Sequence, residues 1–196
     1  MEQLRWQLAQ GDLTNDGLSD EAAMAVLTSP ELLPALMSRL GDPQPVVRGH
    51  AADCLEKMAR QRPAWLAEFL PDLIVRARGD DVPMVRWHLA MVFGHLATQP
   101  APREEVRVCL LDMLSDPSPF VRSWAIVSLL IHARLDPEPP DEIARSVAAL
   151  TADTSAAVRS RAVKAIGLLT QPGASIPQGW IKSEVVRRQL LAGQAG

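Results

Sequence analysis

The side chains of this chain best suited to chemistry are those of four histidines and two cysteines. The histidines are His50, His88, His95 and His132, and a group of them could hold a metal ion or transfer protons. His88 and His95 are seven residues apart, so a helix would place them on one face, about 10 Å apart along its axis. Bonds of about 2 Å to a single metal ion cannot span that distance. The sequence therefore predicts no metal site.

The cysteines and the short motifs also predict no catalytic centre. Cys54 and Cys109 lie in apolar stretches without metal-like spacing, which is typical of two buried thiols in a reducing compartment. The chain has no phosphate-binding glycine loop, no Gly-x-Ser-x-Gly and no Cys-x-x-Cys. Residues 12–23 only faintly match a calcium loop, because Ala23 stands where a glutamate ligand is required. We therefore expect a protein that is not an enzyme and uses no cofactor.

The composition indicates what kind of fold must position these residues. Hydrophobic residues make up 47% and charged residues 22% of the chain, which is typical of a folded domain. Aromatic residues make up only 4% and tyrosine is absent, which favours helices over sheets. The first residues lack the apolar region of a signal peptide, and the apolar runs are too short to cross a membrane. We expect one domain over residues 1–196, no membrane contact and a cytoplasmic location.

A motif of Asp, four residues and Val-Arg occurs four times, at intervals of 36 to 38 residues. A fixed interval of this size is typical of a helical repeat array. Apolar residues follow each motif at helical spacing and predict a second helix of about 15 residues in every repeat. The copies begin at Asp42, Asp80, Asp116 and Asp153.

The residues around each motif predict how the helices begin. The aspartate is expected to cap the second helix, with Pro43 and Pro117 in its first turn. A first helix is expected before each motif, and Pro71 should bend the second of these. The predicted starts of the first helices are Pro30, Pro63, Pro102 and Pro139.

These motifs resemble the HEAT repeat, and the resemblance covers about residues 29–170. It implies an all-α fold, a right-handed α-α superhelix, with its second helices along the concave surface. It also implies that the motif's Asp and Arg form a structural polar ladder between repeats. The repeats are expected at 29–61, 62–99, 100–134 and 138–170, with capping helices within 1–28 and 179–192.

Residues that differ between the repeats are the candidates for binding. On helical wheels of the second helices, the two central repeats present Trp87, His88, Met91, His95 and Trp124 toward the groove. Trp and Met are frequent at interface hot spots, although Met91 and Trp124 could instead be buried between repeats. The complete set of expected partner-binding residues is Trp87, His88, Met91, His95, Trp124, His50, Arg161 and Lys164.

The leading prediction is a scaffold or adaptor that binds another protein in the concave groove. One alternative is nucleic-acid binding, as in the similar HEAT-like alkylpurine DNA glycosylases, although a pI of about 5.8 disfavours it. Another is a lyase or chaperone subunit resembling the HEAT-like phycobilin lyases, which nothing specific supports. The HEAT-like deoxyhypusine hydroxylases carry His-Glu pairs, whereas no acidic residue follows any histidine here.

The charges are unevenly distributed along the chain. Residues 1–42 carry seven acidic and two basic side chains, whereas residues 155–196 carry six basic and one acidic. Because a solenoid places distant sequence at distant positions, these segments are expected at opposite ends of the molecule. We expect a monomer or weak head-to-tail self-association. The basic candidates are Arg161, Lys164, Lys182, Arg187 and Arg188.

Overall fold

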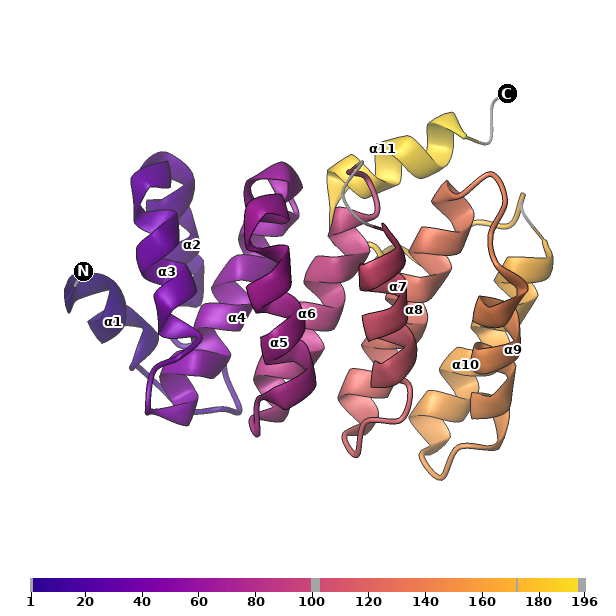
Figure 1. The fold of residues 1–196 in the computed structure, drawn as a ribbon, viewed down its shortest axis with the longest axis horizontal. Helices are drawn as coiled ribbons and strands as arrows, with labels where there is room; N and C mark the ends of the chain where they lie inside the picture. Colours follow the sequence, from indigo (N-terminus) through magenta and orange to yellow (C-terminus); the bar gives the residue numbers. More distant parts are fainter. Residues whose placement is uncertain (1, 100–102, 172, 194–196) are drawn as a thin grey trace.

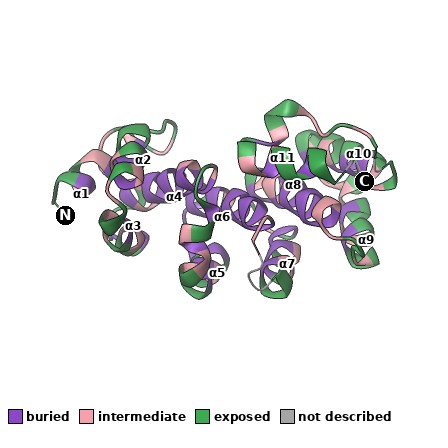
Figure 2. Ribbon diagram, turned by 90° about the horizontal axis from the view of Figure 1, so that it is seen from above, coloured by how far each residue is buried: buried purple, intermediate pink, exposed green. Residues whose placement is uncertain are grey.

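The computed structural model describes residues 2–99, 103–171 and 173–193, and every regular element in these ranges is a helix. The helices form two parallel rows (Figures 1 and 2). The expected all-α solenoid is confirmed. None of the described helices is long and apolar enough to cross a membrane. The row of second helices consists of α4 (Pro45–Ala59), α6 (Pro83–Leu96), α8 (Pro119–Leu135) and α10 (Ala156–Thr170).

The row of first helices is shorter and more broken. A 3₁₀ helix over Pro63–Phe69 precedes α5, so the bend expected at Pro71 is a break instead. Pro71 lies in the first turn of α5, where its missing N–H group has no helical partner to lose. The start predicted at Pro102 lies outside the described residues. The row consists of α3 (Leu33–Arg39), α5 (Leu70–Gly79), α7 (Arg103–Met113) and α9 (Asp141–Ala149).

The motif aspartates do not cap the second helices as predicted. Each carboxylate accepts a hydrogen bond from the N–H group two residues later, as Asp80 does from Val82 at 2.9 Å. Such a bond forms an Asx turn before the helix. The helices therefore begin about three residues after the aspartate, and Pro43 and Pro117 lie outside them. The other Asx turns join Asp42 to Gln44, Asp116 to Ser118 and Asp153 to Ser155.

The polar ladder implied by the HEAT resemblance is present. Arg86 Nε lies 2.6 Å from an oxygen of Asp116 in the next repeat, and its Nη1 donates to the carbonyl oxygen of Asp80 at 2.6 Å. Arg48, Arg86 and Arg122 therefore each join their own turn to the turn of the next repeat. The hydrogen bond from Arg122 holds the pKa of Asp153 below its ordinary value. The other rungs are Arg5–Asp42, Arg48–Asp80 and Arg122–Asp153.

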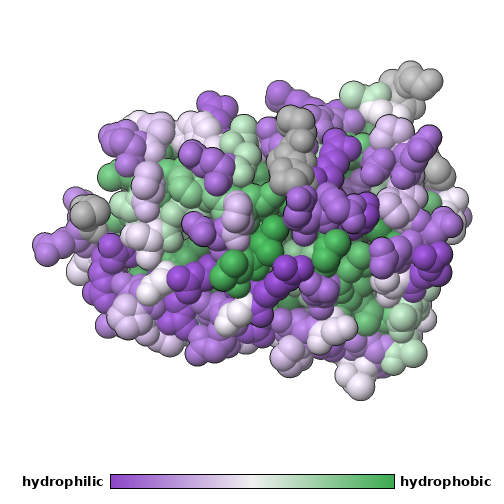
Figure 3. All heavy atoms as spheres, viewed as in Figure 1, coloured by the Kyte–Doolittle hydropathy of each residue, from purple (hydrophilic) through white to green (hydrophobic). Residues whose placement is uncertain are grey.

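The core lies between the two rows and continues along the array. Leu55, Leu89, Phe93 and Ile126 of the second helices are fully buried in it. Figure 2 shows the second-helix row buried along most of its length. On the opposite side of the molecule, hydrophobic side chains are visible in the middle of the first-helix face and hydrophilic ones surround them (Figure 3). Interior helices buried on several sides give this short array its stability.

The ends of the chain extend the fold in different ways. At the N-terminus, α2 (Ser19–Thr28) packs beside α4 and lengthens the second-helix row, and α1 (Glu2–Leu8) packs against both. At the C-terminus, α11 (Glu184–Ala192) packs against α8, and Trp180 of the segment expected to cap the last repeat lies against Arg161 and Lys164 of α10. Ser183, directly before α11, contacts the first repeat, because its hydroxyl donates to the carbonyl oxygen of Arg60 at 2.7 Å.

Candidate functional site

The inner face, defined as the side of the second-helix row that points away from the first helices, is partly covered by the protein itself. Residues 176–190, here called the C-terminal strap, run back along it. Ile181, Val186 and Leu190 of the strap form a separate apolar cluster with Val127 and Ile131 of α8. The basic end of the sequence therefore reaches the middle of the molecule, and the expected separation of acidic and basic segments is only partly correct.

The strap is held by alternating cations and aromatic rings. Lys182 Nζ lies 5.3 Å from the Trp124 ring centre, and the Arg161 guanidinium lies 5.2 Å from Trp124 and 5.3 Å from Trp180. Lys164 Nζ lies 5.9 Å from Trp180. A cation above a ring face is attracted by the ring's negative charge distribution. Trp124, Arg161 and Lys164, all expected to bind a partner, thus contact the protein's own strap.

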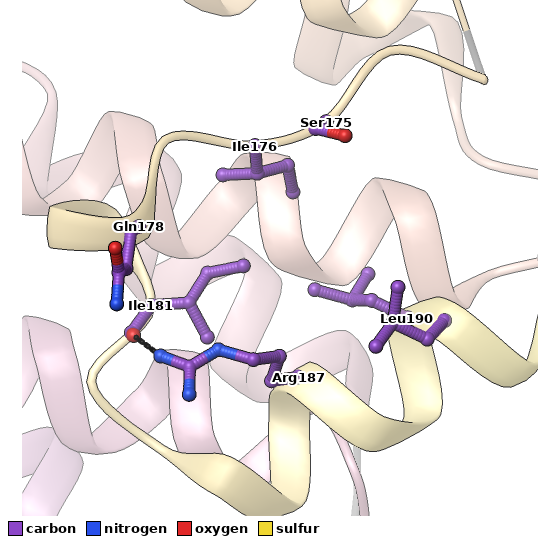
Figure 4. Close-up of a pocket in the computed structure, with 7 residues that line it drawn as sticks. Ser175, Ile176, Gln178, Ile181, Arg187 and Leu190 are labelled. Carbon is purple, nitrogen blue, oxygen red and sulfur yellow. Dashed lines mark hydrogen bonds between the residues drawn. The ribbon is translucent and has the colours of Figure 1, made fainter.

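Figure 4 shows a cavity of about 330 Å³ within the strap region. Its apolar wall includes Ile176, Ile181 and Leu190, while Arg187 donates across it to the carbonyl oxygen of Ile181 at 3.0 Å. The cavity opens to solvent, so part of the apolar surface of the strap is accessible.

Met91 and His95 are buried under the strap, so their expected role in binding a partner is wrong. Each is 4% exposed. His95 Nε2 lies 2.9 Å from a carboxylate oxygen of the fully buried Glu56, which also accepts from Arg60 Nε at 2.9 Å. Burial alone would raise the pKa of Glu56, but hydrogen bonds from His95 and Arg60 lower it to about 2. His95 is thus part of a buried structural network.

His50 is also a structural residue, contrary to the prediction. It is fully buried, and its ring nitrogens lie 2.9 to 3.1 Å from the carbonyl oxygens of Leu8, Asp12 and Asn15. These contacts hold the loop between α1 and α2 against α4. His50 therefore positions a wall of the site and is not itself accessible to a partner.

His88 is 9% exposed, and its Nε2 lies 3.3 Å from Asp53. Burial lowers the pKa of His88 to about 4, so the ring is neutral at pH 7. Asp53 also accepts from the Ser19 hydroxyl and lies 2.9 Å from Lys57 Nζ. Because its charge state is fixed and little of its ring is accessible, His88 serves mainly to support its neighbour Trp87.

The part of the inner face left open is a cavity of about 460 Å³, here called the Trp87 notch. Loop residues 13–16 form one wall, α4 and α6 form the floor, and Phe120 and Lys182 lie on the opposite side. Trp87 is half-buried, and its ring centre lies 5.2 Å from that of Phe120. Phe120 is 62% exposed. Paired aromatic rings at an open cavity are typical of an interface hot spot.

Charges on the two sides of the notch have opposite sign. On the N-terminal side, Lys57 faces three carboxylates, those of Asp16, Asp20 and Asp53, at 2.8 to 3.3 Å. On the other side, Lys182 has no carboxylate within ion-pair distance in the described part of the chain, and the cations next to it lie against tryptophans. The notch is therefore acidic on one side and basic on the other.

Phe120 and Leu13 contribute to the notch but were not predicted. Phe120 directly precedes the Val-Arg pair of its repeat, at the position that Val46, Met84 and Ala157 occupy in the other repeats. The size of its ring at this position was the feature of the sequence that could have identified it. Leu13 lies in a loop without periodicity, so no sequence pattern could place it. It can approach α4 because Gly49 has no side chain: a Cβ there would lie 2.7 Å from Leu13 Cδ2.

Nucleophilic and metal chemistry find little support in the described residues. Burial raises the pKa of Cys109 to about 11 and raises that of Cys54 even further, so both thiols are protonated at neutral pH. Across residues 2–99, 103–171 and 173–193, no group of three or more His, Cys, Asp or Glu side chains is placed to hold a metal ion.

Stacked antiparallel helical hairpins joined by a polar ladder define an α-helical repeat solenoid. A family model described as HEAT repeats matches residues 70–167, and a model of a single HEAT repeat matches residues 32–61. The first match alone covers half of the chain. The chain belongs to the HEAT repeat family.

Similar solved structures share the fold at low sequence identity. A designed armadillo repeat protein is 18% identical with a TM-score of 0.54, and 98% of each chain is covered. An engineered protein is 15% identical with a TM-score of 0.53, covering 99% of this chain and 94% of that one. A structure titled "Crescerin uses a TOG domain array to regulate microtubules in the primary cilium" is 16% identical with a TM-score of 0.48, covering 100% and 89%. A search of curated proteins found no match.

Proposed function

We propose that this chain is a protein-binding scaffold that holds a short segment of a partner protein in the Trp87 notch. The observation that carries the proposal is the Trp87–Phe120 pair at the mouth of an open cavity. The strap covers the neighbouring part of the inner face, whereas Phe120 remains 62% exposed to water. Covering a large exposed aromatic side chain with a partner lowers the free energy of the complex, because apolar surface is removed from water.

The size and lining of the notch favour a few side chains of a peptide. A cavity of about 460 Å³ lies in the range of small binding sites, about 300–1,000 Å³. Its apolar contacts come from Leu13, Met84, Trp87 and Phe120, and charged side chains surround them. This arrangement of an apolar centre and a polar rim is typical of protein recognition sites.

The opposite charges on its two sides predict the character of the bound segment. A basic residue of the partner would lie beside Asp16 and Asp20, an apolar residue on Trp87, and an acidic residue beside Lys182. A nucleic acid fits less well, because its uniform negative charge would meet the aspartates on one side. The proposed partner is therefore another protein, in keeping with the overall pI of about 5.8.

We further propose that the protein acts by binding alone, without catalysis, and that it works in the cytoplasm. Two protonated, buried thiols suit a reducing compartment. Of the titratable groups that line the notch, Lys57 is paired with three aspartates and Arg60 with Glu56. Such pairs stabilise the walls of a binding site.

The proposal is tested by selecting ligands for the purified protein from a displayed library of random peptides about ten residues long. Enriched peptides are synthesised, and their affinities are measured for the wild type and for Phe120→Ala and Trp87→Ala. Val75→Ala is the control, because Val75 is 67% exposed on α5, outside the notch. We expect a loss of roughly 30-fold or more with either aromatic variant, as for an interface hot spot. The Val75 variant should bind as the wild type does.

Two results would overturn this function. One is that no peptide is enriched, or that the enriched peptides bind equally well to Phe120→Ala. The other is tight binding of a labelled single-stranded oligonucleotide at about 0.15 M salt, where screening leaves only close charge contacts effective. If Lys182→Glu abolished that binding, the inner face would be a nucleic-acid site.

A further inference from the structure

The last repeat ends in a stacking surface that nothing in the described structure covers. Ser160, Val163 and Gly167 of α10 are exposed, and Val163 has 60% of its surface in water. Their spacing of three and four residues places them on one side of the helix. This strip lies at the end of the array, beyond the last pair of packed second helices (Figure 1).

The positions of Val163 and Gly167 are buried wherever another repeat follows. Val163 corresponds through the repeat to Ile126, Ala90 and Ala52, each fully buried. Gly167 corresponds to Gly94, where a Cβ would lie 2.6 Å from Ser128 Oγ of the next second helix. A Cβ on Gly167 would meet nothing within 4 Å. The strip therefore has the form of a helix–helix contact whose second helix is missing.

The polar ladder is open at the same end. Arg159 Nη1 donates to the carbonyl oxygen of Asp153 at 2.7 Å, as the corresponding atom of Arg122 does to that of Asp116. Arg122 uses its Nε and Nη2 atoms for the aspartate of the next repeat. Among the described residues, those two atoms of Arg159 have no carboxylate within ion-pair distance. The guanidinium is thus held in position with its carboxylate-binding edge free.

We propose that this end face, formed by Arg159, Ser160, Val163 and Gly167, binds the N-terminal end of a second copy of the chain. This interaction is separate from the Trp87 notch and does not depend on the function proposed for it. The C-terminal strap folds back over α8, so it leaves the end face open to a partner.

The N-terminal end of the molecule has the complementary chemistry. On α1, which lies at the opposite end of the array (Figure 1), Glu2 and Trp6 are four residues apart and both exposed. Trp6 has 60% of its surface in water. An exposed tryptophan beside a carboxylate matches an exposed valine beside an unpaired guanidinium.

A contact between opposite ends is heterologous, so each added copy leaves one free end of each kind. The molecules would therefore form short linear chains that grow with protein concentration. Because the pairing groups are exposed, the contact should be weak and sensitive to salt. The screening length falls from roughly 20 Å at about 20 mM to roughly 6 Å at about 300 mM salt.

Sedimentation velocity over a range of protein concentrations tests the proposal. We expect the weight-average sedimentation coefficient to rise with concentration at about 20 mM salt and to stay near the monomer value at about 300 mM. Val163→Glu and Arg159→Glu should each weaken association by roughly tenfold or more. The control is Arg76→Glu, which makes the same change of charge at an exposed residue of α5 in the middle of the array.

A mixing experiment identifies the two faces. Glu2→Arg and Arg159→Glu copies should associate weakly alone but form alternating chains when mixed, because both end-to-end contacts between unlike copies then join opposite charges. Circular dichroism of each variant confirms folding. A monomer at every low-salt concentration, or equal association of Val163→Glu and the wild type, would overturn the proposal. So would association that Phe120→Ala abolishes, since that would place the second copy in the Trp87 notch.

Discussion

The N-terminal and C-terminal halves of the inner face begin from the same helical repeat and end as different surfaces. In the N-terminal half, α4 and α6 carry the pair of His88 and Asp53 in the lining of an open notch, and the buried pair of His95 and Glu56 lies nearby. In the C-terminal half, the strap covers α8, and cations lie against the rings of Trp124 and Trp180. Buried ion pairs stabilise the N-terminal half, whose surface remains accessible, whereas the strap covers the surface of the C-terminal half.

This difference shows that a place on the inner face does not decide whether a residue is accessible. Trp87 lies one residue after the Val-Arg pair of its helix and Trp124 two residues after it, and both were expected on the inner face. Trp87 borders the open notch, whereas Trp124 lies between Arg161 and Lys182. The non-repeating segments at the two ends of the chain create this difference in accessibility. The loop held by His50 and the strap cover different parts of the second-helix row.

The largest effect should come from the buried network of the N-terminal half. Glu56→Gln removes the carboxylate that pairs with Arg60, and we expect a loss of about 3–5 kcal/mol in the free energy of unfolding. Urea denaturation measures it. Glu184→Gln is the control, because its exposed pair with Arg187 should contribute less than about 1 kcal/mol. Equal losses in the two variants would remove the energetic distinction between the halves.

Acidification should weaken the same half next. Burial lowers the pKa of His88 to about 4, so the unfolded chain binds its proton first as the pH falls. Stability contributed by the neutral ring is complete above about pH 6.5 and is lost as the pH falls toward 4, by on the order of 2–3 kcal/mol. Asp53 and Glu56 face the ring and oppose this shift, whereas Lys57 and Lys182 reinforce it.

Denaturation curves between pH 7 and pH 4.5 test this dependence, and His88→Asn should flatten it. His132 is buried in α8 with its pKa also lowered to about 4, so His132→Asn is the matched variant in the other half. Glu56 has a pKa of about 2 and begins to contribute only below about pH 4.5. A curve that is flat down to pH 4.5 would mean that His88 is protonated in the folded protein without cost.

The ladder should respond in the same way in both halves, because it is common to them. Arg122→Ala strips the charged partner from the largely buried Asp153, and we expect a loss of about 1–3 kcal/mol. Arg48→Ala should cost a similar amount at Asp80. Arg159→Ala, at the open end, should change stability by less than about 0.5 kcal/mol. A melting temperature unaltered by Arg122→Ala would show that the ladder bonds are not stabilising.

The smallest effect should come from releasing the strap. Trp180→Ala removes its contacts with Arg161 and Lys164, and we expect a loss of about 1–2 kcal/mol because the ring is only half-buried. The emission maximum of the remaining tryptophans should shift toward the red as water reaches Trp124. Trp65→Ala, which removes a half-buried ring on the first-helix row, is the control. A red shift no larger than that of the control would show that Trp180 does not hold the strap in place.

The fold could be predicted from the sequence because its signals repeat. Four copies of one motif give the period, the second helices and the ladder, each confirmed by contacts such as Arg86–Asp116. Where a feature depends on local hydrogen bonding, the prediction was less accurate. An aspartate before a helix can cap it or form an Asx turn, and the position of the following proline favours the turn here.

The site could be predicted only in part, because helical wheels describe one helix at a time. They placed Trp87 on the inner face correctly. They also placed His50 and His95 there, although these polar side chains find their partners in a loop and in a neighbouring helix. The strap carries no repeat signal, so its contact with Arg60 could not be foreseen from any spacing in the sequence.

The hydrogen bond from Ser183 to Arg60 joins residues 123 positions apart and has a consequence for how the protein folds. An ordinary solenoid unfolds progressively, because each repeat depends only on its neighbours and the terminal ones fray first. Here the last segment of the chain can dock only after α4, α6 and α8 have formed. Long-range closure of this kind slows folding, since the loop must lose its freedom before the contact is made. It also ties the terminal repeat to the first, so the array should unfold as one cooperative unit.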